Sequence, residues 1–153
     1  MAMRPGAFRN RGGIDPIIME KKILLVHQSE LVRDVLTATL KVEGHKVTAV
    51  PDALEAIKAI SLERPALMVL ELNLPDRTAH LGGVAWDNFL VIAWAGRFGA
   101  KGAIPFIALG GKNGDLDRDR ALELGAVDFL PGRLETHQLV RAVGRAFELA
   151  RLY

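Results

Sequence analysis

Five short runs, each about as long as a β-strand, alternate along the chain with longer stretches of helical periodicity. The runs are Ile23–Val26 (ILLV), Lys46–Val50 (KVTAV), Ala66–Leu70 (ALMVL), Ile104–Leu109 (IPFIAL) and Val127–Leu130 (VDFL). Most of them are apolar throughout, so both faces of the strands are expected to be covered. The alternation therefore predicts an α/β fold in which a five-stranded parallel sheet lies between two layers of helices.

The stretches between and after these runs carry apolar residues at helical spacing. They are 29–42, the segment from Asp52 to Pro65, 86–97, 116–124 and 136–152. Asp52 and Glu55 have the spacing of a capping box, and Gly44 stands where the first helix should end. The residues expected to share the apolar face are Leu31, Val32, Val35, Leu36 and Leu40 in the first helix, and Leu139, Val140, Val143, Ala146, Phe147 and Ala150 in the last.

Composition indicates one globular domain. Half of the 153 residues are hydrophobic and a quarter are charged, which suits a chain that buries a substantial core. Residues 1–20 are rich in Pro, Gly, Arg and Asn and show no periodicity. We therefore expect a flexible N-terminal arm at 1–20 and a single domain at 21–153.

Charge and cysteine content limit the partners and the cellular compartment to be expected for the chain. The formal net charge is only +2, which gives no reason to expect direct binding to nucleic acid. The absence of cysteine excludes disulfides and thiol nucleophiles and fits a reducing compartment. The N-terminus lacks the apolar run of a secretory signal, and the apolar stretch at 84–99 is short and interrupted by charges. We expect a cytoplasmic protein without membrane contact.

The residues that follow the predicted strands mark the place where a ligand would bind. Ligands of open parallel sheets lie beyond the carboxyl ends of the strands, where the strand order reverses. These ends carry His27 and Gln28, Glu71, Gly110 and Gly111, and the segment 131–133. Glu71 ends an otherwise apolar strand, so its carboxylate needs either a partner or a function.

Four strings carry a resemblance to a known family. KKILLV, RPALMVLELNLPD, IPFIAL and LGAVDFL are similar, in order and spacing, to the strand signatures of receiver domains of bacterial two-component response regulators. The chain resembles these domains over roughly residues 21–150. The resemblance implies a three-layer, flavodoxin-like (βα)5 sandwich and a part in phosphorelay signal transduction.

The reactive positions of that family are altered here. The family uses an acidic pair after the first strand, a phosphate-accepting Asp after the third, a Thr or Ser after the fourth and a Lys after the fifth. Together they hold Mg²⁺ and neutralise the phosphoryl group. The matching positions are His27 and Gln28, Glu71, Gly110, and Gly132 with Arg133 beside it; Asn73 and Pro75 fit the family's turn after the acceptor, and Phe129 stands at its aromatic switch position.

These departures imply a pseudo-receiver, a domain that keeps the fold and has lost phosphoryl chemistry. The carboxylates that bind the metal are absent at His27 and Gln28. Glu71 is one methylene longer than Asp, which displaces the nucleophilic oxygen from in-line geometry. We therefore expect no bound metal, no cofactor and no catalytic residue, so the domain should not be an enzyme.

Two interpretations of Glu71 stay open at this level. Its carboxylate is either satisfied by His27, Arg133 or backbone amides, or it imitates a phosphorylated Asp. The imitation is partial, because a carboxylate has one charge and two acceptor atoms against nearly two charges and three acceptors for a phosphate. His27 is either a plain hydrogen-bonded histidine or half of a pH-sensitive pair, since a neighbouring carboxylate raises the pKa of an imidazole.

The glycine-rich segment at 109–115, LGGKNGD, also allows two interpretations. It is either a flexible connection or an anion cradle formed by backbone amides and Lys112. It lacks the spacing of a nucleotide-binding P-loop.

Two surfaces suggest contacts with other proteins. The turn after Pro75, DRTAHLGGV, is longer than the usual connection and could cover the altered site. The third helix contains FLVIAWAG, which is apolar nearly all round, with Leu90 and Trp94 on one face. Either the long turn or a second chain should cover this surface.

The second surface involves the last helix. Arg141 and Arg145 lie one turn apart there. In the family, the surface formed by the fourth helix, the fifth strand and the fifth helix is a common dimer and effector contact. These arginines, with residues 117–120, are therefore the second candidate interface.

The expected function is a non-catalytic signalling module that binds a protein partner: a histidine kinase, an effector or a second copy in a homodimer. One alternative is a receiver phosphorylated by an unusual route on Glu71 or His27. Another is a small enzyme that uses Glu71 and His27 as base and acid at the sheet edge. This second alternative lacks a nucleophile and a recognisable cofactor loop.

Overall fold

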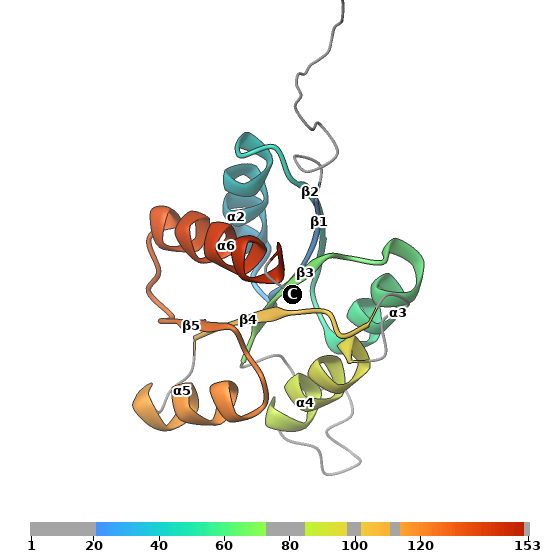
Figure 1. Cartoon of the computed structure of the whole chain (residues 1–153), viewed down its shortest axis with the longest axis vertical. Coiled ribbons are helices and arrows are strands. Elements are labelled where there is room, and N and C mark those ends of the chain that lie inside the picture. Colours follow the sequence, from blue (N-terminus) through green and yellow to red (C-terminus); the bar gives the residue numbers. More distant parts are fainter. Residues whose placement is uncertain (1–20, 73–84, 98–101, 111–113, 152–153) are drawn as a thin grey trace, which may run out of the picture.

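Five parallel strands form one sheet through the centre of the molecule, in the order β2-β1-β3-β4-β5 (Figure 1). The strands are β1 (Lys22–Val26), β2 (Lys46–Val50), β3 (Leu67–Glu71), β4 (Phe106–Leu109) and β5 (Asp128–Leu130). The computed structural model describes residues 21–72, 85–97, 102–110 and 114–151. Because β3 is the middle strand, its last residue, Glu71, lies at the centre of the carboxyl edge of the sheet.

Helices cover both faces of the sheet. They are α2 (Glu30–Val42), α3 (Ala53–Glu63), α4 (Ala85–Gly96), α5 (Gly114–Glu123) and α6 (Thr136–Arg151). Figure 1 shows α2 and α6 on one side of the sheet and α3, α4 and α5 on the other. The predicted three-layer α/β sandwich with a five-stranded parallel sheet is confirmed.

Capping residues explain where the first two helices begin and where α2 ends. The side chains of Ser29 and Asp52 accept hydrogen bonds from backbone amides in the first turns of α2 and α3. Gly44 follows α2 with a φ of 93°, and its N–H donates to the carbonyl of Lys41. The predicted helix boundaries therefore rest on identifiable local hydrogen bonds.

The core has two parts, one on each face of the sheet. Leu24, Met68 and Leu70 point toward α3, α4 and α5, where they meet Phe89 and Ile92. The intervening strand residues point the other way and pack against α2 and α6; they include Ile23, Leu25, Leu67, Val69 and Ile107. Since successive side chains of a strand point to opposite faces, this division is expected of strands that are apolar throughout.

Three residues predicted to face the core are exposed instead. Leu31 and Val35 of α2 have exposed fractions of 73% and 46%, and Ala150 near the end of α6 is also exposed. The helix α2 packs on the sheet mainly through Leu36 and Leu40. Periodicity alone shows which residues share a helix face, but it does not show how far along that face the sheet extends.

None of the helices in the described ranges has the length and apolarity required to cross a lipid bilayer. The arm predicted at residues 1–20 lies outside the described residues.

Candidate functional site

The parallel register brings the predicted site residues to one edge of the sheet. Glu71, the last residue of β3, is in register with Leu109 of β4. His27 and Gly110 follow directly after β1 and β4. Residues that lie far apart in the sequence therefore meet at the carboxyl edge, where ligands of such sheets bind.

Glu71 uses both of its carboxylate oxygens. The backbone N–H of Gln28 donates to Oε1 at 2.9 Å, and Nε2 of His27 lies 3.3 Å from Oε2. The side chains of His27 and Glu71 are only 15% and 12% exposed. Among the described residues, Glu71 pairs with His27 and Gln28 and not with Arg133, which is exposed.

The loop between β1 and α2 determines which nitrogen of His27 carries the proton. The N–H of Ser29 donates to Nδ1 of His27 at 3.0 Å, so this nitrogen must be an acceptor. The neutral ring then carries its proton on Nε2, which faces Glu71. Arg33 stabilises the same loop, because its Nη1 donates to the carbonyl oxygens of His27 at 2.7 Å and Gln28 at 3.1 Å.

The pKa of His27 is lowered from its ordinary value of 6.5. Burial of the ring is the largest cause, and the nearby Arg33 lowers the pKa further, whereas Glu71 raises it. Glu71 thus acts on the pKa in the expected direction, but the net shift of the pKa is downward. The cost of removing the imidazolium from water outweighs its attraction to Glu71.

Two glycines face each other across the edge. Gly110 has a φ of +79° and donates its N–H to the carbonyl of Leu130 at 2.8 Å. A Cβ on either Gly110 or Gly132 would lie 3.8 Å from the Cα of the other. Neither position supplies a hydroxyl or an ammonium group.

A cavity of about 400 Å³ opens beside these residues. It lies between α2 and the segments that follow β4 and β5. Its walls include the exposed Leu31 and Val35 of α2, and His27 and Glu71 also line it. The sequence placed a ligand site at this edge, but it did not predict that α2 lines the cavity or that Ser29 and Arg33 bind the loop after β1.

The switch-position aromatic, Phe129, is partly buried and packs against the core on the α3, α4 and α5 side. Its neighbour Asp128 accepts a hydrogen bond from Arg145 of α6 at 2.9 Å. This bond links the end of the sheet to the last helix.

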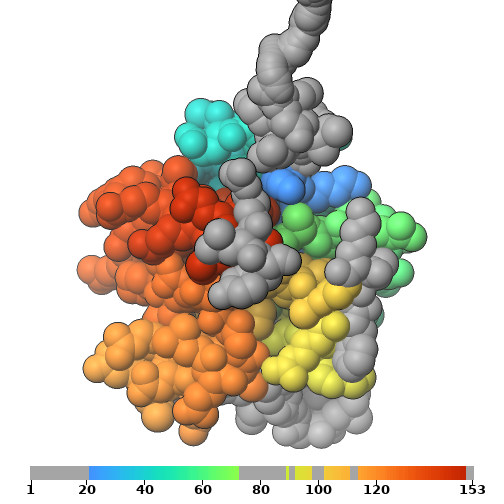
Figure 2. Space-filling model, viewed as in Figure 1, coloured from blue at the N-terminus to red at the C-terminus, as the bar shows by residue number. Residues whose placement is uncertain are grey.

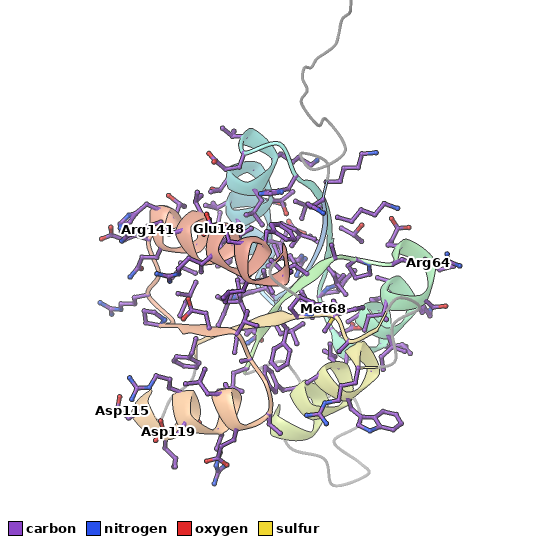
Figure 3. The ribbon with its side chains drawn as sticks, in the orientation of Figure 1. Arg64, Met68, Asp115, Asp119, Arg141 and Glu148 are labelled. Carbon is purple, nitrogen blue, oxygen red and sulfur yellow. The ribbon has the colours of Figure 1, made fainter. Side chains whose placement is uncertain are left out.

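The two candidate interfaces differ in how much of them the structure describes. On α4, Trp94 is 64% exposed, while the side chain of Leu90 lies outside the described residues. Figure 2 shows α5, β5 and α6 (orange to red) forming one side of the molecule, and Figure 3 shows Arg141 on α6 and Asp115 and Asp119 on α5 at its periphery.

One member of the second interface was predicted wrongly. Asp117 is 3% exposed, so the surface within 117–120 comes from its neighbours. It sits on the inward side of α5, whereas Asp115 and Asp119 are exposed, because residues two positions apart on an α-helix point to nearly opposite sides. Asn73, Pro75, Lys112 and the turn at 76–84 lie outside the described residues.

Groups of three or more potential metal-ligating side chains do not occur within the described residues. His27 and Glu71 approach each other, but Gln28 contributes its backbone N–H, which is a donor and not a ligand.

No family model matches the chain. A signal receiver domain from Vibrio parahaemolyticus is similar in structure, with 24% identity and a TM-score of 0.70 over 87% of this chain and 94% of that one. The chain has the receiver fold. The non-phosphorylated receiver domain of HemR from Leptospira biflexa matches with 26% identity and a TM-score of 0.67, over 83% of this chain and 94% of that one.

A third similar structure has the same fold. It is the receiver domain of the sensor histidine kinase PA1611 from Pseudomonas aeruginosa, with 24% identity and a TM-score of 0.68 over 84% of this chain and 98% of that one. Its structure has a magnesium ion coordinated in the active site cleft. The receiver fold is thus shared, and the carboxyl edge of this chain's own sheet carries His27, Glu71, Gly110 and Gly132.

Proposed function

We propose that the chain is a pseudo-receiver: a signalling module with the receiver fold that acts by binding a protein partner and is not switched by phosphorylation. The observation that carries this proposal is the state of Glu71. Its Oε1 accepts a hydrogen bond from the backbone N–H of Gln28 at 2.9 Å, and its Oε2 lies 3.3 Å from Nε2 of His27, so the β1–α2 loop contacts both oxygens. These contacts stabilise the carboxylate in place, which makes it a weaker nucleophile toward a phosphoryl donor.

The surroundings of Glu71 support the same conclusion. Phosphoryl transfer needs positive groups or metal ions that neutralise the transferring oxygens. His27 is held neutral by the N–H of Ser29, and Gly110 and Gly132 have no side chains that could contribute. Glu71 alone is a poor site for Mg²⁺, which prefers several oxygen ligands in octahedral array.

Incubation with acetyl phosphate and Mg²⁺, followed by intact mass measurement, tests this proposal. We expect no mass gain in the natural chain. As a matched control, the variant His27→Asp, Gln28→Asp, Glu71→Asp and Gly132→Lys restores the acidic pair, the acceptor and the lysine of a working receiver, and it should gain one phosphoryl group. A phosphoryl gain in the natural chain that disappears in Glu71→Gln would overturn the proposal.

The partner contact is proposed for the exposed face of α4 around Trp94. Trp94 is 64% exposed, and tryptophan is a residue type that is often buried at the centre of protein interfaces. We expect a second copy of the chain to be the first partner detected. Multi-angle light scattering during gel filtration should then show a concentration-dependent dimer.

Trp94→Glu should abolish that dimer, because it places a charge at the centre of the contact. Val42→Glu is the matched control, since Val42 is 83% exposed but belongs to α2 on the other side of the sheet. Equal loss of the dimer in both variants, or no loss in Trp94→Glu, would exclude α4 as the contact.

A further inference from the structure

The cavity at the carboxyl edge has the size and lining of a ligand site. Its volume of about 400 Å³ falls within the range of small-molecule pockets. Its walls are largely aliphatic and come from α2 and from the segment after β5, including Leu31, Val35 and Leu134. Apolar walls with a few polar groups at one end are typical of such pockets.

The two glycines explain why the space is open. Gly110 and Gly132 both line the cavity, and neither carries a side chain that could fill it. Leu31 and Val35 are spaced one helical turn apart and remain 73% and 46% exposed, so their apolar surface is still available. An apolar group placed here would remove that surface from water.

Glu71 gives the cavity its charge. It is the only lining residue with a full charge in the described part of the cavity, because His27 is kept neutral by the hydrogen bond from Ser29 to Nδ1. Oε1 of Glu71 accepts one hydrogen bond and Oε2 lies 3.3 Å from Nε2 of His27, and each oxygen can accept a further donor. Arg33 lies nearby but is not part of the lining, and its guanidinium binds backbone carbonyls of the loop.

We propose that this cavity binds a small amphipathic amine, with the ammonium group on Glu71 and the apolar body against Leu31, Val35 and Leu134. An anion is disfavoured because the ionised carboxylate would repel it. A neutral ligand would bind less tightly, since hydrogen bonds to charged groups are stronger than neutral ones.

The inference rests on the proposed function in one respect: Glu71 must remain an unmodified carboxylate. Binding of such an amine would then replace phosphorylation as the signal read by the domain.

Three probes of similar shape test the preference for a cation. Phenethylamine, phenethyl alcohol and phenylacetate are titrated separately into isotope-labelled protein, and amide proton–nitrogen spectra are recorded. Phenethylamine should shift the signals of Gln28, Gly110 and Gly132. Phenethyl alcohol should bind about tenfold more weakly, and phenylacetate should cause no shift at these positions.

Variants assign the effect to the cavity. Glu71→Gln keeps the size of the side chain and removes the charge, so the amine and the alcohol should then bind equally. Gly132→Leu should fill the space and abolish binding of both, because Gly132 has room for a side chain at ordinary contact distance. Gly132→Ala, with a smaller side chain, provides a folded comparator if the leucine variant is unstable, and it should weaken binding of both probes by a smaller factor.

Equal shifts with phenethylamine and phenylacetate, no shift with any probe, or an amine affinity unchanged in Glu71→Gln would each overturn the inference. The result of the phosphorylation assay does not depend on the result of these titrations. A chain that binds the amine and also takes up a phosphoryl group overturns the proposed function alone, whereas a chain inert to both reagents overturns only the ligand site.

Discussion

The interior of the sheet and its carboxyl edge differ in how their space is filled. In the interior, Leu24, Leu25, Val69 and Leu70 have no exposed surface, and helices cover both faces. At the edge, a few residues further along the same strands, two glycines and a cavity of about 400 Å³ replace packed side chains. The interior residues of the strands therefore stabilise the fold, whereas the residues at the carboxyl ends of the same strands determine the chemistry of the site.

The physical reason is that close packing stabilises the fold in the interior, whereas the edge contributes little buried apolar area. Residues at the edge can therefore change without loss of the fold. This accounts for a receiver fold that presents His27, Glu71 and glycines at its edge.

The sharpest test of this contrast is truncation of an interior leucine. Leu70→Ala should lower the free energy of unfolding by about 2 to 5 kcal/mol, because it removes a fully buried side chain and leaves a cavity. Leu31→Ala at the edge is the matched control and should cost about 0.5 kcal/mol or less, since Leu31 is 73% exposed. Urea unfolding measures both values, and equal losses would contradict the division.

A smaller effect should distinguish the two glycines of the edge. Gly110→Ala should lower the free energy of unfolding by about 1 to 2 kcal/mol, because its φ of +79° is unfavourable for residues with a Cβ. Gly132 has no such backbone conformation and has room for a Cβ, so Gly132→Ala should leave stability nearly unchanged. If thermal unfolding gave the reverse order, the edge would be constrained by packing and not by backbone conformation.

The smallest expected effect is the pH dependence that His27 confers. Its folded pKa is lowered below 6.5, so the folded state favours the neutral ring. The stability from this group is fully present above pH 6.5 and is lost as the pH falls through the lowered pKa. Protonation would also place a second N–H against the amide of Ser29.

Denaturant unfolding between pH 7 and pH 5 measures this loss as a decrease in the free energy of unfolding. His27→Gln should reduce the decrease. His45→Gln is the comparator, because burial also lowers the pKa of His45, which lies away from the edge between α2 and α6. If only His45→Gln altered the pH dependence, the interpretation of the His27 ring would be wrong.

Much of the fold could be predicted from local patterns. The runs at Ile23–Val26 and Lys46–Val50 correspond closely to β1 and β2, and Ser29 and Asp52 begin the helices that follow. The limits of this approach appear at Leu31 and Asp117. Their helix faces follow from periodicity, but their burial depends on how far neighbouring elements extend.

The sequence was enough to predict which residues form the candidate site, but not how their side chains interact. The ends of parallel strands meet at one edge, so His27, Glu71 and Gly110 could be grouped from the sequence. The direction of the pKa shift of His27 could not be predicted, because burial and Arg33 lower the pKa whereas Glu71 raises it. Their balance depends on distances that only folding establishes.

The sequence by itself determined the order of the elements, the apolar strands that require cover on both faces, and the loss of side chains at Gly110 and Gly132. These follow from local preferences and residue identity. Only the tertiary structure decided that Glu71 is bound by the loop after β1, and that the glycines and α2 line a cavity in which Glu71 is the charged residue of the described part. Such features depend on how segments distant in the chain approach one another, and no local pattern specifies that approach.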